Sequence, residues 1–178
     1  MKTAFPTDKI GGTQEFIFMF REDERYLSNF WPCNVTLPEE TVVIDGEEIN
    51  LPAMDFDSTE NAYMAWKTLD LKLRKKIQTL DAGDAKELTH EDDFPTRPDY
   101  SDNGRIAIME ILVRQKYSIR NPWLMEKLMN TGTATIAEGN TWSDTFFGFC
   151  LRTGTGQNWL GRITMKIRDE LLYPMLKK

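Results

Sequence analysis

Hydrophobic and polar positions follow a strand-like pattern early in the chain and a helical one later. Residues 15–20 form an apolar run that predicts a strand. Residues 41–44 and 47–51 flank Asp45-Gly46, a dipeptide typical of a hairpin turn. After Asp57 the apolar residues recur at helical spacing. We expect helices at 58–68, 70–79, 105–118, 121–130 and 157–173, and a short strand at 133–137.

This order of elements, strands first and helices after, predicts a helix-dominated α+β fold. A small N-terminal antiparallel sheet is expected to pack against a bundle of helices. Residues 1–14 are polar and contain glycine, so we expect a flexible arm there. A chain of 178 residues is long enough for one domain with a sizeable core and too short to expect two. Residues 15–178 are therefore predicted to form a single domain.

Charge and composition exclude several classes of protein. The net charge of −6 argues against broad nucleic-acid affinity, which needs clustered Lys and Arg. The apolar runs are too short for a membrane helix, and the N-terminus lacks the apolar segment of a signal peptide. Cys33 and Cys150 are expected to be reduced thiols of a cytoplasmic protein. His90, the single histidine, is expected in a surface loop, and no ligand cluster for a metal is present in the sequence.

The segment 56–67 contains the most informative side chains. On a helix, Glu60, Tyr63 or Met64, and Lys67 form one column roughly 10 Å long, which could line a pocket. A second interpretation is a capping box, with Asp57 as the N-cap and Glu60 bonding a backbone N–H. The two interpretations assign the Glu60 carboxylate to chemistry and to helix capping, respectively.

Four further blocks accompany this helix in order along the chain. They are LSNF at 27–30, a methionine-bearing helix that ends in Lys116-Tyr117, EGNTWSDTFFG at 138–148 and GQNWLG at 156–161. Together with the SxExxYxAxK pattern of residues 58–67, these blocks resemble the NADAR family, also called the YbiA-like family. The resemblance covers roughly residues 16–172. It implies a single YbiA-like domain that cleaves N-glycosidic bonds of ribosylated bases or ADP-ribose conjugates.

The resemblance also implies roles for individual residues. Glu60 matches the family glutamate and is expected to position water or to stabilise positive charge at the anomeric carbon. Asp144 matches a family aspartate and is expected to orient the ribose hydroxyls or the water, although an Asx turn or N-cap is its alternative role. The expected substrate-binding residues are Ser28, Asn29, Phe30, Lys67, Tyr100, Asn140, Trp142 and Asn158. Neither a cofactor nor a metal is expected.

Several of these assignments have a structural alternative. Phe30 and Trp142 could stack on a base, but aromatic residues in a domain of this size more often pack in the core. The glycine-bearing turn at 153–158 could cradle a phosphate or simply begin a helix. Lys67 could meet a phosphate or the Glu60 carboxylate.

The sequence departs from the family pattern at three places. The tryptophan that the family has ahead of the methionine helix is absent, and the nearest aromatic residue is Tyr100, one position out of step. Phe147 replaces a tryptophan and so lacks its N–H donor. Additional residues between Gly46 and Asp57 lengthen the connection from the hairpin to the helix. The missing tryptophan could affect how the substrate base is bound. The additional residues could change the shape of the pocket rim.

The sequence therefore supports two functional hypotheses. The first is a metal-independent N-glycosidase acting on an ADP-ribosylated guanine base, in nucleic acid or nucleotide, or on a ribosylated pyrimidine phosphate of the riboflavin pathway. The alternative is a non-catalytic module that binds ADP-ribose or another NAD-derived ligand. Glu60, Lys67 and Asp144 together favour the enzyme, because binding alone would tolerate neutral residues there. No membrane partner is expected.

Overall fold

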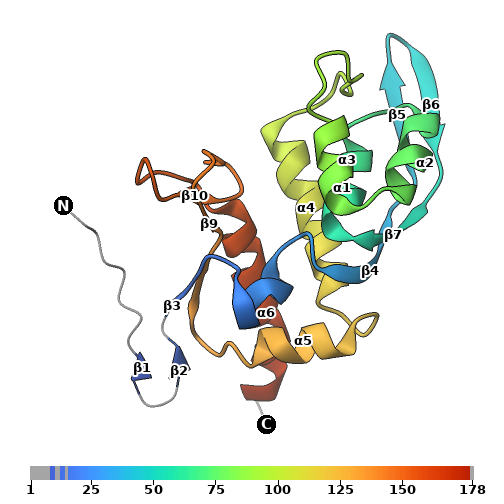
Figure 1. Ribbon diagram of the computed structural model, residues 1–178. Coiled ribbons are helices and arrows are strands. Elements are labelled where there is room, and N and C mark those ends of the chain that lie inside the picture. The colour runs from blue at the N-terminus through green and yellow to red at the C-terminus, as the bar shows by residue number, and fades with distance from the viewer. Residues whose placement is uncertain (1–8, 11–12, 15, 177–178) are drawn as a thin grey trace. The chain divides into compact units, whose positions relative to one another are not determined.

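The computed structural model describes residues 9–10, 13–14 and 16–176 (Figure 1). By its internal contacts the chain forms two compact units. We call residues 29–121 the middle unit, and residues 1–28 with 122–178 the terminal unit. The helix-dominated α+β class predicted from the sequence is confirmed, with several helices and small two-stranded sheets. Within the described residues, no helix is long and apolar enough to cross a membrane.

Two antiparallel strand pairs belong to the middle unit. The hairpin of β5 (Glu40–Ile44) and β6 (Glu47–Leu51) turns at Asp45-Gly46, as predicted, with positive φ at both residues. Strands β4 (Pro32–Leu37) and β7 (Met54–Ser58) form the second pair, which the sequence reasoning missed. Buried and exposed positions alternate along both strands, which is the pattern of a half-buried strand.

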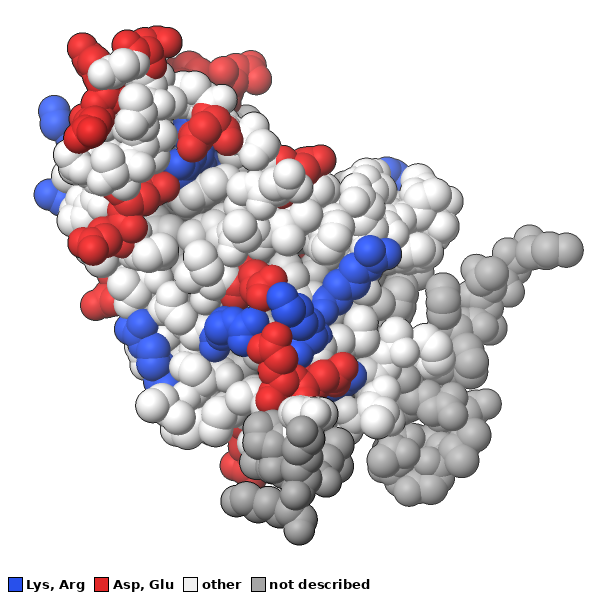
Figure 2. All heavy atoms as spheres, turned by 180° about the vertical axis from the view of Figure 1, so that it is seen from behind, with Lys and Arg blue, Asp and Glu red and all other residues white. Residues whose placement is uncertain are grey.

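The hairpin end of the middle unit is acidic. In the view of Figure 2 acidic side chains gather at the upper left, over the β5–β6 hairpin. Glu39, Asp45, Glu47 and Glu48 are all exposed there. This end of the middle unit is therefore unsuited to binding an anion.

Helix α1 (Thr59–Trp66) lies at the centre of the middle unit, and all eight of its residues are buried. It packs against α2 (Leu71–Thr79), α3 (Ala82–Leu88), α4 (Asp102–Lys116) and strands β4 and β7. The expected N-cap was wrong, because the Ser58 hydroxyl, and not Asp57, accepts the Asn61 N–H at 3.1 Å. Asp57 is exposed on the outer face of β7 instead. Ser58 is therefore the N-cap of α1. The interpretation that Glu60 takes part in chemistry stays a prediction.

The predicted helices differ from the observed ones mainly by the addition of α3. The carboxylate of Asp81 begins this helix by accepting the N–H groups of Gly83 and Asp84. Ala85, on the side of α3 that packs inward, is fully buried. A glycine in the first turn and only seven residues made this helix hard to foresee.

The terminal unit contains η1 (Glu22–Leu27), α5 (Pro122–Met129) and α6 (Trp159–Leu176). Two of its strand pairs are parallel: β3 (Phe16–Phe18) with β8 (Thr135–Ala137), and β9 (Gly139–Asn140) with β10 (Phe149–Cys150). The predicted arm at 1–14 falls mostly outside the described residues. Its described part is the antiparallel pair β1 (Lys9–Ile10) and β2 (Thr13–Gln14).

Candidate functional site

The start of α1 meets the turn that follows Ser28. The backbone N–H of Glu60 donates to the carbonyl oxygen of Asn29 at 3.0 Å. Both side chains are buried, and the Asn29 amide nitrogen lies 3.4 Å from the sulfur of Met109 on α4. The Asn29 Oδ1 atom is buried and accepts no hydrogen bond from the residues that the structure describes. Two predicted site residues from separate motifs, Asn29 and Glu60, are thus brought together.

Lys67 lies at the other end of the predicted column, directly after α1. Its ammonium group donates to the Thr89 hydroxyl at 3.3 Å. Burial lowers the pKa of Lys67 to about 8; the Glu60 charge opposes this shift, and the nearby cations Lys86 and Arg105 add to it. The charge of Glu60 therefore acts on Lys67 at the other end of the column.

Lys86, on α3, is a candidate site residue that the sequence reasoning missed. Its Nζ atom lies 3.6 Å from Oε1 of Glu60 and 5.4 Å from the ring centroid of Phe30. Phe30 itself is 42% exposed, so the expectation that it packs in the core is wrong. It follows a buried residue at a bend, and its ring is covered by a lysine instead of by the core. The Asp81 cap was the signal that could have located α3, and with it Lys86.

Tyr100 packs on α1. Its hydroxyl lies 3.1 Å from the Tyr63 hydroxyl, and its ring centroid lies 5.7 Å from that of Trp66. Arg105 donates to the Tyr63 hydroxyl at 3.2 Å. Burial, followed by the Tyr100 contact, raises the pKa of Tyr63, so this phenol stays protonated. These contacts bring Tyr100 to the buried helix that carries Glu60, while its role as a substitute for the family tryptophan stays a prediction.

An arginine network anchors the segment that ends at Tyr100. Arg97 donates to both carboxylate oxygens of Glu40, at 3.1 and 3.0 Å, and to the carbonyl oxygen of Trp66 at 3.2 Å. Arg74, fully buried, donates to the same Glu40 at 2.6 Å. The network ties the hairpin, α2 and the segment before α4 to the end of α1. It thereby fixes the position of Tyr100.

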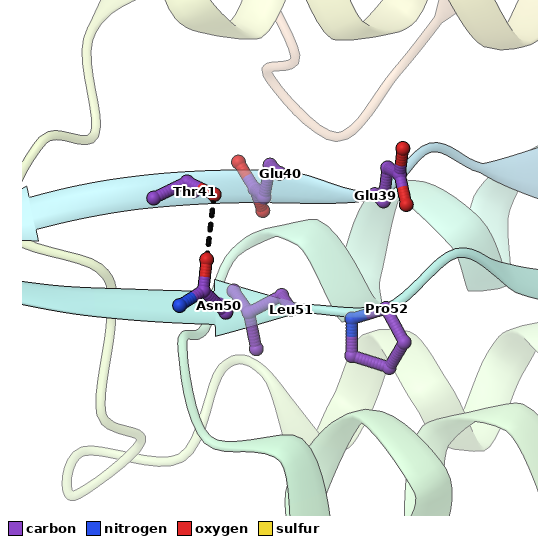
Figure 3. A pocket seen from close by; sticks show the side chains of 6 residues that line it. All are labelled: Glu39, Glu40, Thr41, Asn50, Leu51 and Pro52. Carbon is purple, nitrogen blue, oxygen red and sulfur yellow. Dashed lines mark hydrogen bonds between the residues drawn. The ribbon is translucent and has the colours of Figure 1, made fainter.

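Glu40 also lines a hollow beside the hairpin, with a volume of about 540 Å³ (Figure 3). In its wall the Thr41 hydroxyl donates to the Asn50 side-chain oxygen at 2.7 Å. The other lining residues are Glu39, Leu51 and Pro52. None of the predicted site residues lines this hollow, and its carboxylate Glu40 is already bonded to two arginines.

In the terminal unit, Asn140 and Asp144 organise the loop after β9. The fully buried Asn140 side chain donates to the Asp144 carbonyl oxygen at 2.7 Å and accepts the Asp144 N–H at 3.2 Å. Oδ1 of Asp144 accepts the N–H groups of Phe146 and Phe147, at 3.0 and 3.1 Å. Asp144 thus performs the turn-capping role that was its alternative. Its catalytic role stays a prediction, and it belongs to a different unit from Glu60.

Two other predicted binding residues of the terminal unit lie near its surface. Trp142, in the loop after Asn140, is 62% exposed, so the expectation of a core position is wrong. Loop residues on either side of it are also exposed, which leaves the indole without a core to enter. Ser28 is half-buried at the end of η1, where its N–H donates to the Arg25 carbonyl oxygen. Their roles in binding stay predictions.

Asn158 and the glycines around it hold the beginning of α6. The Asn158 side chain accepts the Glu138 N–H at 3.0 Å and donates to the Ile136 carbonyl oxygen at 2.9 Å. A Cβ on Gly161 would approach that same carbonyl oxygen to 2.2 Å, so only glycine fits there. The N–H groups of residues 157–160 donate to carbonyl oxygens of residues 145–148. These bonds support the structural interpretation of the turn over the phosphate cradle.

The remaining ionisable groups offer no metal centre. Within the described residues, no group of three or more His, Cys, Asp or Glu side chains is placed to hold a metal ion. His90 is exposed, as predicted, and its pKa is lowered by partial burial and by the charges of Lys67 and Lys86. Cys33 and Cys150 are both buried, free thiols.

The fold and these motifs define a helix-dominated α+β protein whose buried central helix carries a carboxylate at its start and a lysine at its end. The chain belongs to the NADAR family, because the NADAR domain model matches residues 16–172. The solved NMR structure of the Escherichia coli protein YbiA has the same fold, with a TM-score of 0.70. That match has 23% sequence identity and covers 93% of this chain and 90% of YbiA.

A second comparison gives a relative of greater length. A riboflavin biosynthesis protein of Vibrio vulnificus is 32% identical over 158 residues, which cover 87% of this chain. The matched region spans only 38% of that protein. The name of that relative therefore describes a protein more than twice as long as the part that is similar here.

Proposed function

We propose that the protein is an N-glycosidase with Glu60 as its central carboxylate. The observation that carries this proposal is the position of Glu60: buried, at the start of α1, with the ammonium group of Lys86 at 3.6 Å. Family membership and the name of the Vibrio relative support a glycosidase-like role in nucleotide or riboflavin chemistry. Asn29, Phe30, Lys67 and Tyr100 are the candidate substrate contacts of the same unit.

The proposed reaction consumes one water molecule. The water oxygen forms a bond to the anomeric carbon while the bond from that carbon to the base nitrogen breaks. Glu60 takes a proton from the water and passes it to the departing nitrogen, so that the carboxylate ends in its original state. The same carboxylate stabilises the positive charge that develops at the sugar before the new bond is complete.

Two substrate classes fit this chemistry. One is an ADP-ribosylated guanine base of nucleic acid or nucleotide, and the other is a ribosylated pyrimidine phosphate of the riboflavin pathway. Both carry phosphate, and the positive charges of Lys67 and Lys86 suit it. The name of the Vibrio relative favours the pyrimidine substrate. A net charge of −6 disfavours extended contact with nucleic acid, so a base in nucleic acid would be recognised locally.

Product analysis tests this proposal. The protein is incubated with ADP-ribosylated guanosine and, separately, with the ribosylated pyrimidine phosphate, and the products are identified by mass spectrometry. We expect release of guanosine and ADP-ribose from the first substrate, or of the free pyrimidine base and ribose phosphate from the second, with the same rate in EDTA. Tight ADP-ribose binding without release of any base would support the non-catalytic module. Loss of activity in EDTA, with recovery on adding Mg²⁺ or Zn²⁺, would assign Glu60 or Asp144 to a metal.

A further inference from the structure

Helix α3 holds both ends of the α1 column. Its Lys86 reaches Glu60, and Thr89, three residues later, accepts a hydrogen bond from Lys67. The Thr89 hydroxyl also donates to the Lys86 carbonyl oxygen at 3.0 Å, which fixes its orientation at the end of the helix. Lys86 on α3 and Thr89, directly after it, thus contact Glu60 on α1 and Lys67, directly after it. Lys86 lies beside the Glu60 carboxylate, and the Glu60 charge also acts on Lys67.

Positive charge is in excess at this place. Besides burial, the charges of Lys86 and Arg105 lower the pKa of Lys67. The charge of Glu60 raises it. Arg105 also forms an ion pair with Asp102, at 3.1 Å. Burial, and after it the charges of the neighbouring cations, lowers the pKa of both Lys67 and His90. In a chain with net charge −6, such an excess of cations favours an anionic ligand.

The contact between Lys86 and Glu60 is suited to exchange. At 3.6 Å it is a long ion pair, and the Lys86 side chain is 34% exposed while that of Glu60 is 7% exposed. Ion pairs with a solvent-accessible partner contribute little to stability, because water competes for the charge. A doubly charged phosphate offers Lys86 a stronger partner than a single carboxylate does.

We propose that Lys67 and Lys86 form a phosphate site, with Thr89 holding Lys67 in position, and that Lys86 exchanges Glu60 for the phosphate when it binds. The inference rests on the proposed function in one respect, namely that the phosphate belongs to the substrate. The exchange draws the Lys86 ammonium group away from Glu60 as the substrate arrives. Lys86 is then a specificity-determining residue for phosphorylated substrates.

The single histidine provides a direct measurement of this site. We follow the imidazole of His90 by NMR while titrating the full-length protein with inorganic phosphate, ribose 5-phosphate and ADP-ribose. Phosphate between the lysines should raise the pKa of His90, because it offsets the two cations that lower it. Lys86→Gln should raise the His90 pKa without ligand and weaken phosphate binding about tenfold or more. Lys86→Arg, which keeps the charge, should bind nearly as the wild type does.

Matched controls make the result decisive. Lys76→Gln removes an exposed lysine of α2 in the same unit and should change neither phosphate affinity nor the His90 pKa. Tighter binding of ribose 5-phosphate than of ADP-ribose would identify a phosphate monoester as the source of the anion, and the reverse order a diphosphate. Equal phosphate affinity of the wild type and Lys86→Gln, at unchanged melting temperature, would overturn the proposal.

The glycosidase and the phosphate site can fail separately. Phosphate binding that depends on Lys86, in a protein that hydrolyses neither substrate class, would keep the site and refute the enzyme. Hydrolysis with Lys86-independent phosphate binding would keep the enzyme and refute the site. If both hold, Lys86→Gln should raise KM for the phosphorylated pyrimidine substrate about tenfold and leave KM for its dephosphorylated form unchanged.

Discussion

At the residue scale, Glu60 differs from most other acidic side chains of the middle unit in being buried. Asp55, Asp57 and Glu39 are exposed, and Glu40 is held by two arginines, whereas the buried Glu60 has the Lys86 ammonium group at 3.6 Å. Burying a carboxylate beside such a long ion pair costs stability. That cost is a reason to assign Glu60 to chemistry.

Glu60→Gln should lower turnover by about 10²–10⁴-fold with little change in fold or ligand binding, because it keeps the shape and removes the charge. Turnover, ligand affinity and thermal melting are measured on the same preparation. Glu87→Gln, on the exposed side of α3, is the control and should keep full turnover. Ser58→Ala should instead lower the free energy of unfolding by about 1 kcal/mol, since Ser58 is the N-cap. A fully active Glu60→Gln enzyme would remove Glu60 from the mechanism.

Lys67 gives the site its pH dependence. Because burial lowers its pKa to about 8 from the ordinary 10.5, its positive charge is present below that pH and is lost as the pH rises through it. Affinity for ribose 5-phosphate, whose second pKa lies near 6, should therefore fall between pH 7 and pH 9. Calorimetric titrations across this range measure the fall. Lys67→Met should bind more weakly at pH 7 and show no such dependence; an equally steep fall in that variant would assign the titration elsewhere.

At the element scale, the sequence predicted the long and strongly patterned parts of the fold. The β5–β6 hairpin follows from Asp45-Gly46, and α1 follows from its change of period after Asp57. Helix α3 was missed because it is short, and strand β4 because it begins at a proline and mixes polar with apolar residues. Missing α3 had a functional consequence, since it supplies Lys86 and leads into Thr89. The hydrogen bond between Asn29 and the start of α1 joins two separate chain segments. The periodicity of the sequence does not predict such a contact.

The Glu40 network links three elements and should govern stability more than chemistry. Glu40→Gln would leave Arg74, which is fully buried, and Arg97 without their shared carboxylate. Removing one partner of a buried ion pair costs about 3–5 kcal/mol. Arg97 also pairs with Asp99, and Glu40 is partly exposed. We therefore expect the free energy of unfolding to fall by about 3 kcal/mol, near the lower end of this range. Urea denaturation measures it, and Glu39→Gln, one exposed residue earlier, should stay within about 0.5 kcal/mol of the wild type.

At the scale of the whole molecule, the predicted site residues divide between the two compact units. Asn29, Phe30, Glu60, Lys67 and Tyr100 belong to the middle unit, whereas Ser28, Asn140, Trp142, Asp144 and Asn158 belong to the terminal unit. In the terminal unit the structure gives Asn140 and Asn158 defined structural roles, because both ends of each amide bond the backbone of neighbouring segments. The family motifs in the terminal unit therefore contain residues that stabilise loops as well as candidate substrate contacts.

The prediction that Asp144 acts with Glu60 can be tested by a double-mutant cycle. Asp144→Asn keeps an oxygen that can accept the Phe146 and Phe147 N–H groups, so the turn should survive while the charge is lost. Asp144→Ala removes that acceptor as well and should cost about 1 kcal/mol of stability, which separates capping from chemistry. If both carboxylates serve one reaction, Asp144→Asn should lower turnover, and its effect should shrink in a Glu60→Gln background, because residues that act as a unit are not additive. Strictly multiplicative effects on turnover would mean that the two residues act independently, and an unchanged rate in Asp144→Asn would leave Asp144 with the turn alone.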